Sequence, residues 1–378
     1  MRHKLSQACR IIPPQMHAQV LSRFVRRIFS FHGAKNEQPA TSNQQPATSN
    51  QNLTDKLIDS ILGTGNLNDS DRTLILKNAQ RLRDTKVHIL ITGATGCGKS
   101  STINALFDSE KARVGQGADP ETMHIARYDL ENIVLFDSPG LGDGKEADRR
   151  HAKGIMDKLL EKDNEGNLLI DLVLVILDGG SRDLGTSYEL IEQVIIPNLG
   201  DDQKRLLVAI NQADMAMKGR HWNHEKNQPE PPLIQFLDEK VASTQRRIRE
   251  ATGVDVDVIC YAAGYKDGDN QQYPWNLSKL LAYMLRHTKE EKRIVFSKDM
   301  NKNDEMWEDD DELEDYNKEI KKSFMESIKK AVTKGASKGA EIGREIGNLF
   351  GMGGAGEFVG GMVGGAIGFV GGLFSSWW

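Results

Sequence analysis

The chain has few cysteines, little net charge and no long apolar run near its start, and each shortage excludes a class of protein. Its 378 residues include three cysteines, Cys9, Cys97 and Cys260, which are too widely separated for a disulfide scaffold or a four-thiolate zinc site and which suit a reducing cytosol. A net charge of −5 argues against a protein that coats nucleic acid. The basic N-terminus lacks the apolar run of a secretory signal, so we expect none.

Charge and glycine are unevenly spread, which divides the chain into segments. Residues 1–36 carry seven Arg or Lys and no acid, residues 304–315 hold nine acids, and 15 of the 36 glycines lie in 335–372. We predict a basic amphipathic segment at 1–32, a flexible linker at 33–52, a helical lead-in at 53–85, an α/β domain at 86–293, an acidic spacer at 294–318, an amphipathic basic helix at 319–348 and a glycine-rich helical tail at 349–378.

The N-terminal segment has the pattern of a helix that lies on a membrane. Over residues 20–31, apolar side chains fill one half of a helical wheel, and serines and arginines fill the other. This pattern is typical of an interfacial helix on an anionic bilayer, although docking on the protein body or an organelle transit segment would give the same pattern. The linker contains the unit QPATSNQ twice and cannot offset the entropy of ordering.

The tail has a second membrane-like pattern. Glycine recurs at every fourth residue over 335–351 and over 356–372, which lets helices pack closely within a bilayer. Residues 358–374 carry no charge, and Trp377 and Trp378 suit the membrane–water interface. We expect membrane association and self-association here, with a helical hairpin packed on the protein body as the alternative. The acidic spacer should repel itself and stay solvated, or clasp the basic N-terminus.

Between these ends, short apolar strands alternate with helices. The predicted strands are 87–92, 133–137, 172–177, 206–210 and 256–260, with one more near 124–130 that runs antiparallel to 133–137. The predicted helices are 53–62, 70–83 (capped by Asp69 or Ser70), 99–107, 146–161, 186–195, 233–250 and 276–288, with an inserted loop at 215–232. Almost wholly apolar strands indicate an α/β fold whose mostly parallel sheet has helices on both faces.

A glycine-rich loop follows the first predicted strand directly. It reads Gly93-Ala94-Thr95-Gly96-Cys97-Gly98-Lys99-Ser100-Ser101, which contains a full match to the phosphate-binding pattern G-x-x-x-x-G-K-[ST]. The glycines let the backbone wrap a phosphate, and N–H groups at the start of a helix point toward it. We expect Lys99 to reach the β- and γ-phosphates and Ser100 to ligate Mg²⁺.

A second motif, Asp137-Ser138-Pro139-Gly140, ends the predicted strand at 133–137. Asp137 would hold Mg²⁺ through water, and the Gly140 N–H would sense the γ-phosphate; a plain turn is the alternative. Thr122, in the preceding polar loop, is placed to close over Mg²⁺. Lys99, Thr122 and Gly140 are therefore the candidate catalytic residues, and Ser100, Thr122 and Asp137 the candidate metal ligands.

Two further motifs would read the base. Asn211-Gln212-Ala213-Asp214 follows the strand at 206–210, and the Asp214 carboxylate can accept hydrogen bonds from guanine N1–H and N2–H₂. Adenine has an unprotonated N1 there, so Asp214 favours GTP over ATP. Tyr261-Ala262-Ala263-Gly264 follows the last strand, and the backbone of Ala262 or Ala263 could donate to guanine O6.

With these motifs the chain resembles the Ras-like, translation-factor-related P-loop GTPases. It is most similar to the Era-like, AIG/Toc and immunity-related branches, which share Gly-x-Thr-Gly-x-Gly-Lys-Ser-Ser and Asp-x-Pro-Gly-Leu. The resemblance covers residues 86–288 and implies a six-stranded sheet with one antiparallel strand, a Mg²⁺·GTP or GDP site at the strand carboxyl ends, and switch loops around Thr122 and 137–144. Gln212 stands where these proteins usually have lysine, and Tyr261-Ala262 where they have Ser-Ala.

The residues expected to support hydrolysis are incomplete. Leu141 occupies the place where many relatives have a water-orienting glutamine, which predicts slow intrinsic hydrolysis that self-association or a partner accelerates. Asp143, Arg149 and Arg150 could assist, although charged helix starts are usually solvated. Cys97 could act as a redox brake or be a small tolerated side chain. His221, His224 and Glu225 have a metal-like spacing, which a polar solvent-facing loop also explains.

The patterns together predict a cytoplasmic GTPase, associated with membrane lipid through its tail, that acts as a nucleotide switch or assembly protein. The main alternative is an Era-like assembly GTPase that acts on ribosomal RNA and whose tail mediates only self-association. A pore-forming effector, suggested by the glycine ridge alone, is a third hypothesis.

Overall fold

The computed structural model describes residues 68–107, 113–114, 125–140, 144–267 and 270–336. Several expectations from the sequence lie outside these residues. They are the N-terminal helix, the linker, the helix at 53–62, the glycine-rich tail, Thr122, Leu141 and Asp143.

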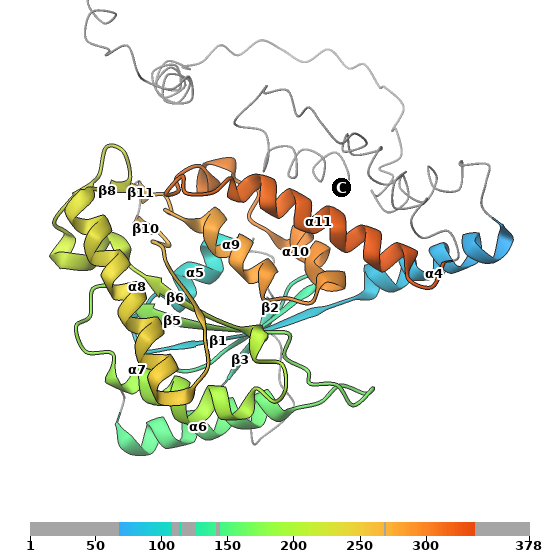
Figure 1. The fold of residues 1–378 in the computed structure, drawn as a ribbon, viewed down its shortest axis with the longest axis horizontal. Coiled ribbons are helices and arrows are strands. Elements are labelled where there is room, and N and C mark those ends of the chain that lie inside the picture. Colours follow the sequence, from blue (N-terminus) through green and yellow to red (C-terminus); the bar gives the residue numbers. More distant parts are fainter. Residues whose placement is uncertain (1–67, 108–112, 115–124, 141–143, 268–269, 337–378) are drawn as a thin grey trace, which may run out of the picture. The chain divides into compact units, whose positions relative to one another are not determined.

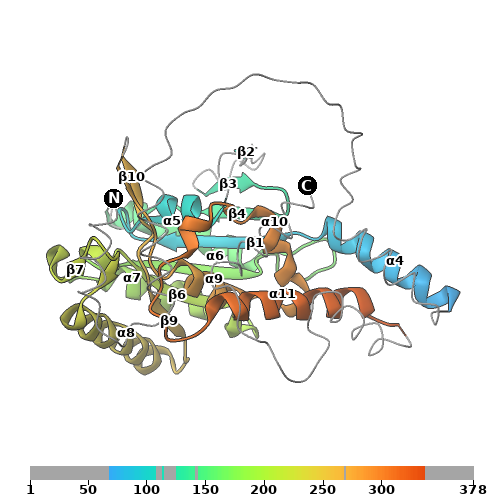
Figure 2. The same ribbon diagram turned by 90° about the horizontal axis from the view of Figure 1, so that it is seen from above.

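A mostly parallel sheet forms the centre of the described residues (Figures 1 and 2). Its spatial order is β2 (Arg113–Val114), β3 (Ala126–Asp129), β4 (Ile133–Asp137), β1 (Val87–Gly93), β5 (Leu172–Asp178), β6 (Leu206–Asn211) and β9 (Asp257–Cys260). The strands from β4 to β9 pair in parallel, whereas β3 is antiparallel to β4. The expected six strands with one antiparallel member are confirmed, and the two-residue β2 adds an antiparallel edge next to β3.

Helices cover both faces of this sheet because successive side chains of each strand point to opposite faces (Figure 1). Along β5, Leu172, Leu174 and Ile176 join one buried cluster and the alternate residues join the other. The first face carries α5 (Lys99–Leu106), α9 (Leu277–Arg286) and α11 (Tyr316–Thr333). The second carries α6 (Lys145–Leu160), α7 (Gly185–Glu189) with its continuation Leu190–Ile195, and α8 (Pro231–Thr252).

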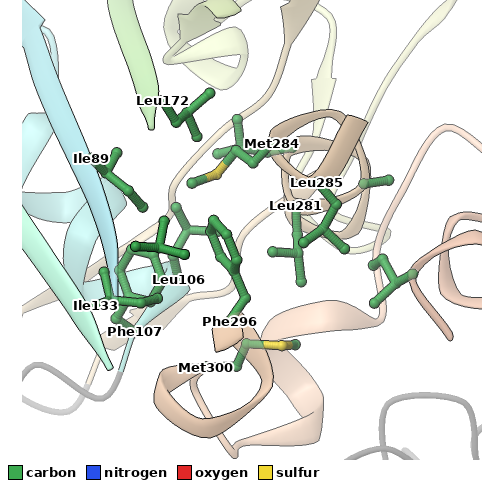
Figure 3. Close-up of a cluster of buried hydrophobic side chains, with 14 of the residues drawn as sticks. Ile89, Leu106, Phe107, Ile133, Leu172, Leu281, Met284, Leu285, Phe296 and Met300 are labelled. Atoms are coloured by element: carbon green, nitrogen blue, oxygen red, sulfur yellow. The ribbon is translucent and has the colours of Figure 1, made fainter. Parts of the chain in front are cut away.

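The core on the first face includes residues that follow the predicted domain. Figure 3 shows Ile89 and Ile133 of the sheet facing Leu281, Met284 and Leu285 of α9, with Phe296 of α10 (Phe296–Asp299) among them. Phe296 is fully buried there. Residues after 293 therefore contribute to the same core as the strands.

The acidic segment is packed on the domain, which corrects the expectation of a solvated spacer. Trp307, within the acidic run, and Tyr316, directly after it, are both 2% exposed. The Asp311 carboxylate accepts hydrogen bonds from Lys279 Nζ at 2.6 Å and Tyr316 Oη at 2.9 Å, and Asp310 accepts from Ser278 Oγ at 3.1 Å. The repulsion expected from nine acids is offset because α9 supplies donors and a positive charge to them.

Two helices that flank the domain in sequence pack against each other. α4 (Asp69–Asp84) is capped by Asn68, whose side chain accepts from Asp71 N at 2.7 Å, so the cap is one residue before the earliest predicted position. Asn78 of α4 donates to the carbonyls of Val332 and Lys334 at 3.0 and 2.9 Å, which satisfies the C-terminal end of α11.

The apolar stripe of α11 is buried in the body of the protein. Its members Ile320, Phe324, Ile328 and Val332 belong to the core on the first face, while Lys322 and Lys329 are exposed. The amphipathic pattern therefore serves intramolecular packing over Tyr316–Thr333. Among the helices that the structure describes, none has the length and apolarity needed to cross a bilayer.

Candidate nucleotide-binding site

The phosphate loop lies between β1 and α5, as the sequence predicts. Gly96 and Gly98 have φ of +81° and +89°, a region that favours glycine. A Cβ on Gly98 would lie 2.2 Å from Asn211 Nδ2, so the loop approaches the neighbouring loop too closely for any other residue. Because Gly98 is also the N-cap of α5 and offers no side-chain cap, the first N–H groups of this helix can bind an anion.

Lys99 and Ser100 begin α5. The ammonium of Lys99 donates to the carbonyls of Gly93 and Ala94, both at 3.2 Å. The Lys99 side chain therefore extends from the end of the loop back to its first two residues. Ser100 is exposed in the first helical turn. This arrangement places a positive charge and a hydroxyl group beside the helix N-terminus, where the sequence predicts phosphates and a metal ion.

Asp137, at the carboxyl end of β4, has the features of a metal-site acid. β4 pairs in parallel with β1, which aligns Asp137 with Ile91, two residues before Gly93. Its Oδ1 is buried and has no hydrogen-bond partner among the described residues. Burial raises the pKa of Asp137 above its usual value, and the charge of Lys99 opposes that shift. A buried oxygen that lacks a donor fits Mg²⁺, which prefers oxygen ligands and retains water, so Asp137 and Ser100 could hold it.

Gly140 lies directly against the phosphate loop. A Cβ at this position would lie 2.2 Å from Thr95 Oγ1 and 2.6 Å from Thr95 N. The strand end that leads to it is fixed because Ser138 Oγ donates to Thr92 Oγ1 at 2.8 Å and Ser138 N donates to Ile91 O at 3.0 Å. The second predicted switch region therefore begins in contact with the loop that would hold the phosphates.

The base loop is tied to the phosphate loop by two side chains. Asn211 Nδ2 donates to Cys97 O at 2.9 Å, and Gln212 Nε2 donates to Gly96 O at 2.7 Å. Gln212 has a left-handed backbone with φ of +60°. Gln212 stands where the resembling proteins usually have lysine, and here its neutral amide connects the two loops.

Asp214, the predicted base reader, is largely buried. Burial raises the pKa of Asp214 above its usual value, and a hydrogen bond from Gln272 opposes the shift. Gln272 Nε2 donates to Asp214 Oδ2 at 3.1 Å. Gln272 belongs to no nucleotide motif and lies 58 positions from Asp214 in the sequence, so the sequence motifs do not indicate this contact.

The N–H groups of Ala262 and Ala263 have partners within the protein, which corrects the expected contact to guanine O6. Ala262 N donates to Trp275 O at 3.0 Å, and Ala263 N donates to Asn211 Oδ1 at 2.9 Å. An N–H group has one hydrogen to donate, so in this arrangement neither is directed at a base. The Ala263 N–H instead holds the side chain of Asn211, and the Ala262 N–H holds the backbone of Trp275.

The weaker candidates from the sequence find structural explanations. Burial raises the pKa of Cys97 to about 11, which keeps it a thiol and argues against a redox brake. His221 Nδ1 faces Glu230 Oε2 at 3.3 Å, and no group of three metal-binding side chains exists within the described ranges. Arg149 and Arg150 are exposed on α6.

Comparison with known proteins finds relatives of this region. Residues 88–212 match a family model described as a 50S ribosome-binding GTPase. The tRNA modification GTPase MnmE of Xanthomonas oryzae pv. oryzae is 36% identical over 115 residues, which cover 28% of this chain and 24% of MnmE. The uncharacterized protein YfjP of Escherichia coli is 29% identical over 147 residues, which cover 38% of this chain and 47% of YfjP.

Among solved structures, Toc33 of Arabidopsis thaliana in complex with Mg²⁺ and GMPPNP is 15% identical, with a TM-score of 0.35 and coverage of 57% of this chain and 85% of Toc33. With respect to MnmE, the chain spans about a quarter of the length of the protein that it matches. The family model runs from the second residue of β1 into the base loop, so it contains the phosphate loop, Asp137 and Asn211 in order. Residues 88–212 of this chain therefore contain a P-loop GTPase domain of the Ras-like kind.

Proposed function

We propose that the protein is a nucleotide switch or assembly GTPase that hydrolyses GTP slowly with Mg²⁺ and works at a membrane. The observation that carries the nucleotide part is the buried Asp137 Oδ1 at the end of β4, which has no hydrogen-bond partner among the described residues and lies beside the strand that leads into the phosphate loop. When bound, Mg²⁺ would neutralise charge on the phosphates. Lys99 would bind the phosphates, and Asp214 would accept the donors of guanine.

Slow hydrolysis follows from Leu141, which cannot orient a water molecule. We expect GTP turnover per molecule to be low in dilute protein and to rise with protein concentration, as a second copy completes the site. Phosphate release measured over a hundredfold range of protein concentration tests this part. Turnover that is already fast at the lowest concentration, or that stays constant across the range, would contradict it.

Membrane association rests on residues after 336. The apolar stripe of α11 is buried, so it is not free to contact lipid. The glycine period and the charge-free run at 358–374 then supply the membrane segment, with the basic pattern at 20–31 as a second contact.

Liposome flotation of the full chain and of residues 1–336 tests the membrane part. The shorter chain keeps every described residue, including Ala336, whose N–H donates to Thr333 O at 3.0 Å. We expect the full chain to float with vesicles and the shorter chain to remain in the soluble fraction, while both bind GDP equally. Equal soluble fractions for the two chains would end the membrane proposal without affecting the GTPase proposal.

An assembly factor that acts on ribosomal RNA is the second candidate. The matched family model is described as ribosome-binding, and the MnmE relative is named as a tRNA modification GTPase. The exposed lysines of α11, such as Lys322 and Lys329, offer a basic surface. Co-sedimentation of residues 1–336 with ribosomes, lost as salt is raised, would favour this candidate over the membrane switch.

A further inference from the structure

A short hairpin brings Gln272 to the base-reading carboxylate. The hairpin consists of β10 (Tyr265–Asp267) and β11 (Asn270–Gln272) and follows directly after Gly264. Tyr265 pairs with Gln272, so Gln272 lies at the open end of the hairpin, next to the base loop. From there its Nε2 donates to Asp214 Oδ2 at 3.1 Å.

The backbone of Gln272 can lie this close to residue 264 only if that residue is glycine. Gly264 has φ of +69°, and a Cβ there would lie 2.3 Å from Gln272 O. Beyond the hairpin, Ala262 and Trp275 exchange two backbone hydrogen bonds, at 3.0 and 2.9 Å, which closes the loop at its base. The backbone of Gln272 is therefore fixed relative to the strand that ends at Cys260.

Residues outside the hairpin also form hydrogen bonds with the chain directly after Gln272. Asn227, buried in the inserted loop, donates through Nδ2 to Tyr273 O at 2.9 Å and to Asp309 Oδ2 at 2.9 Å. The hydroxyl of Tyr273 donates to Glu305 of the acidic segment. Three additions to the sheet, namely the inserted loop, the hairpin and the acidic segment, thus converge on the residue that follows Gln272.

We propose that Gln272 is a positioning residue for guanine recognition, which holds the Asp214 carboxylate in one orientation through a neutral hydrogen bond to Oδ2. This inference rests on the proposed role of Asp214 as base reader. A carboxylate has about four acceptor positions, so one donor on Oδ2 leaves positions for guanine N1–H and N2–H₂. The hydrogen bond also opposes the effect of burial on the pKa of Asp214 and so favours the ionised form that two base donors require.

The opposite role would be competition, in which the Gln272 amide occupies the place of a base donor and must leave when the nucleotide binds. The two roles predict effects of opposite sign. Removal of a positioning residue weakens guanine binding, whereas removal of a competitor strengthens it. The contacts of Tyr273 and the close approach at Gly264 leave the hairpin little room to withdraw, which favours positioning.

Equilibrium binding of GDP and ADP to the full chain tests the inference in Gln272→Ala, Gln272→Glu and the matched control Gln271→Ala. Gln271 is the exposed neighbour on the same strand. We expect Gln272→Ala to raise the Kd for GDP about tenfold, as for loss of a hydrogen bond to a charged group. We expect a larger loss in Gln272→Glu, because a like charge faces Asp214. The Kd for ADP and the behaviour of Gln271→Ala should be unchanged.

The guanine-to-adenine affinity ratio separates positioning from a merely structural role. Tighter or unchanged GDP binding in Gln272→Ala, or an equal loss for GDP and ADP, would overturn the inference. The variant Asp214→Asn distinguishes a failure of the proposed role of Asp214 from a failure of the proposed role of Gln272. If that variant keeps the guanine preference, the base-reading role of Asp214 is wrong; if it loses the preference while Gln272→Ala keeps it, only the role of Gln272 is wrong.

Discussion

The side-chain amide of Asn211 donates to the main-chain carbonyl of Cys97 across 2.9 Å, which joins the base loop to the phosphate loop. The carbonyl of the same amide accepts from Ala263 N at 2.9 Å. Asn211 is buried, so one side chain connects the loops that follow β1, β6 and β9. These hydrogen bonds therefore fix the distance between the phosphate loop and the base loop.

Asn211→Asp should break this connection, because it keeps the acceptor for Ala263 but places a carboxylate oxygen opposite Cys97 O. We expect the free energy of unfolding to fall by about 1–3 kcal/mol, the penalty for an unsatisfied buried group, with weaker GDP binding. Denaturant unfolding with and without GDP measures both effects. Asn104→Asp, an exposed change of the same kind on α5, is the control, and similar losses in the two variants would contradict the prediction.

Lys99→Ala should abolish nucleotide binding while leaving the fold intact. Among the described residues, the ammonium of Lys99 donates hydrogen bonds to carbonyls of its own loop, so without nucleotide the variant should melt at nearly the same temperature as the wild type. Loss of charge-assisted bonds to phosphate should raise the Kd for GDP by roughly a hundredfold or more. Thermal melting with a GDP titration checks this, since a ligand that no longer binds no longer stabilises. A variant that GDP still stabilises would argue against the phosphate role of Lys99.

Gly140→Ala should slow hydrolysis, because the added methyl group would lie 2.2 Å from Thr95 Oγ1 and force the two loops apart. GDP binding, which needs no γ-phosphate contact, should change by less than about threefold, while GTP turnover should fall at least about tenfold. Gly154→Ala is the matched control, since its nearest neighbour, Ile125 Cδ1, lies at 3.9 Å. Equal turnover in the two variants would show that the contact with Thr95 is dispensable.

The acidic segment should make stability depend on pH. Burial raises the pKa of Asp311, but the hydrogen bond and charge of Lys279 outweigh it and hold the pKa below its usual value. A depressed pKa stabilises the fold above the unfolded value of about 3.9, and this contribution is lost as pH falls through the folded pKa. Asp311→Asn should therefore lower the melting temperature at pH 7 and flatten its decline toward pH 3.

Glu250→Gln, on the exposed face of α8, is the control for removing one acid. Each kcal/mol lost should lower the melting temperature by about 2–4 °C in a protein of this size. The prediction fails if Asp311→Asn and Glu250→Gln have the same melting temperature at pH 7 and the same decline with pH.

The sequence predicts the strands and the phosphate loop well because those features are local. Apolar runs place β4 at Ile133–Asp137 without error, and the glycine spacing locates the loop from Gly93 to Lys99. The antiparallel β3 is likewise predicted from the residues and is confirmed, whereas the order of the strands in the sheet comes from the structure alone.

What the sequence misses depends on long-range partners. Counting acids predicts repulsion in 304–315, but it cannot reveal that Lys279 and Ser278 meet Asp311 and Asp310. Likewise, nothing near Gln272 signals its contact with Asp214, and nothing near Ala263 shows that its N–H is used by Asn211. Gly264 marks a turn in the sequence, but its φ of +69° and the closeness of the hairpin are known only from the structure.

Competitive binding of GDP, ADP and XDP to the wild-type chain and to Asp214→Asn tests whether the Asp214 carboxylate selects guanine. We expect the wild type to prefer GDP over ADP by about a hundredfold or more, since guanine can donate two hydrogen bonds to the carboxylate. In Asp214→Asn the preference should pass from GDP to XDP, because the amide can donate to the xanthine 2-carbonyl. Wild-type protein that binds ADP as tightly as GDP, or a variant that keeps the GDP preference, would contradict it.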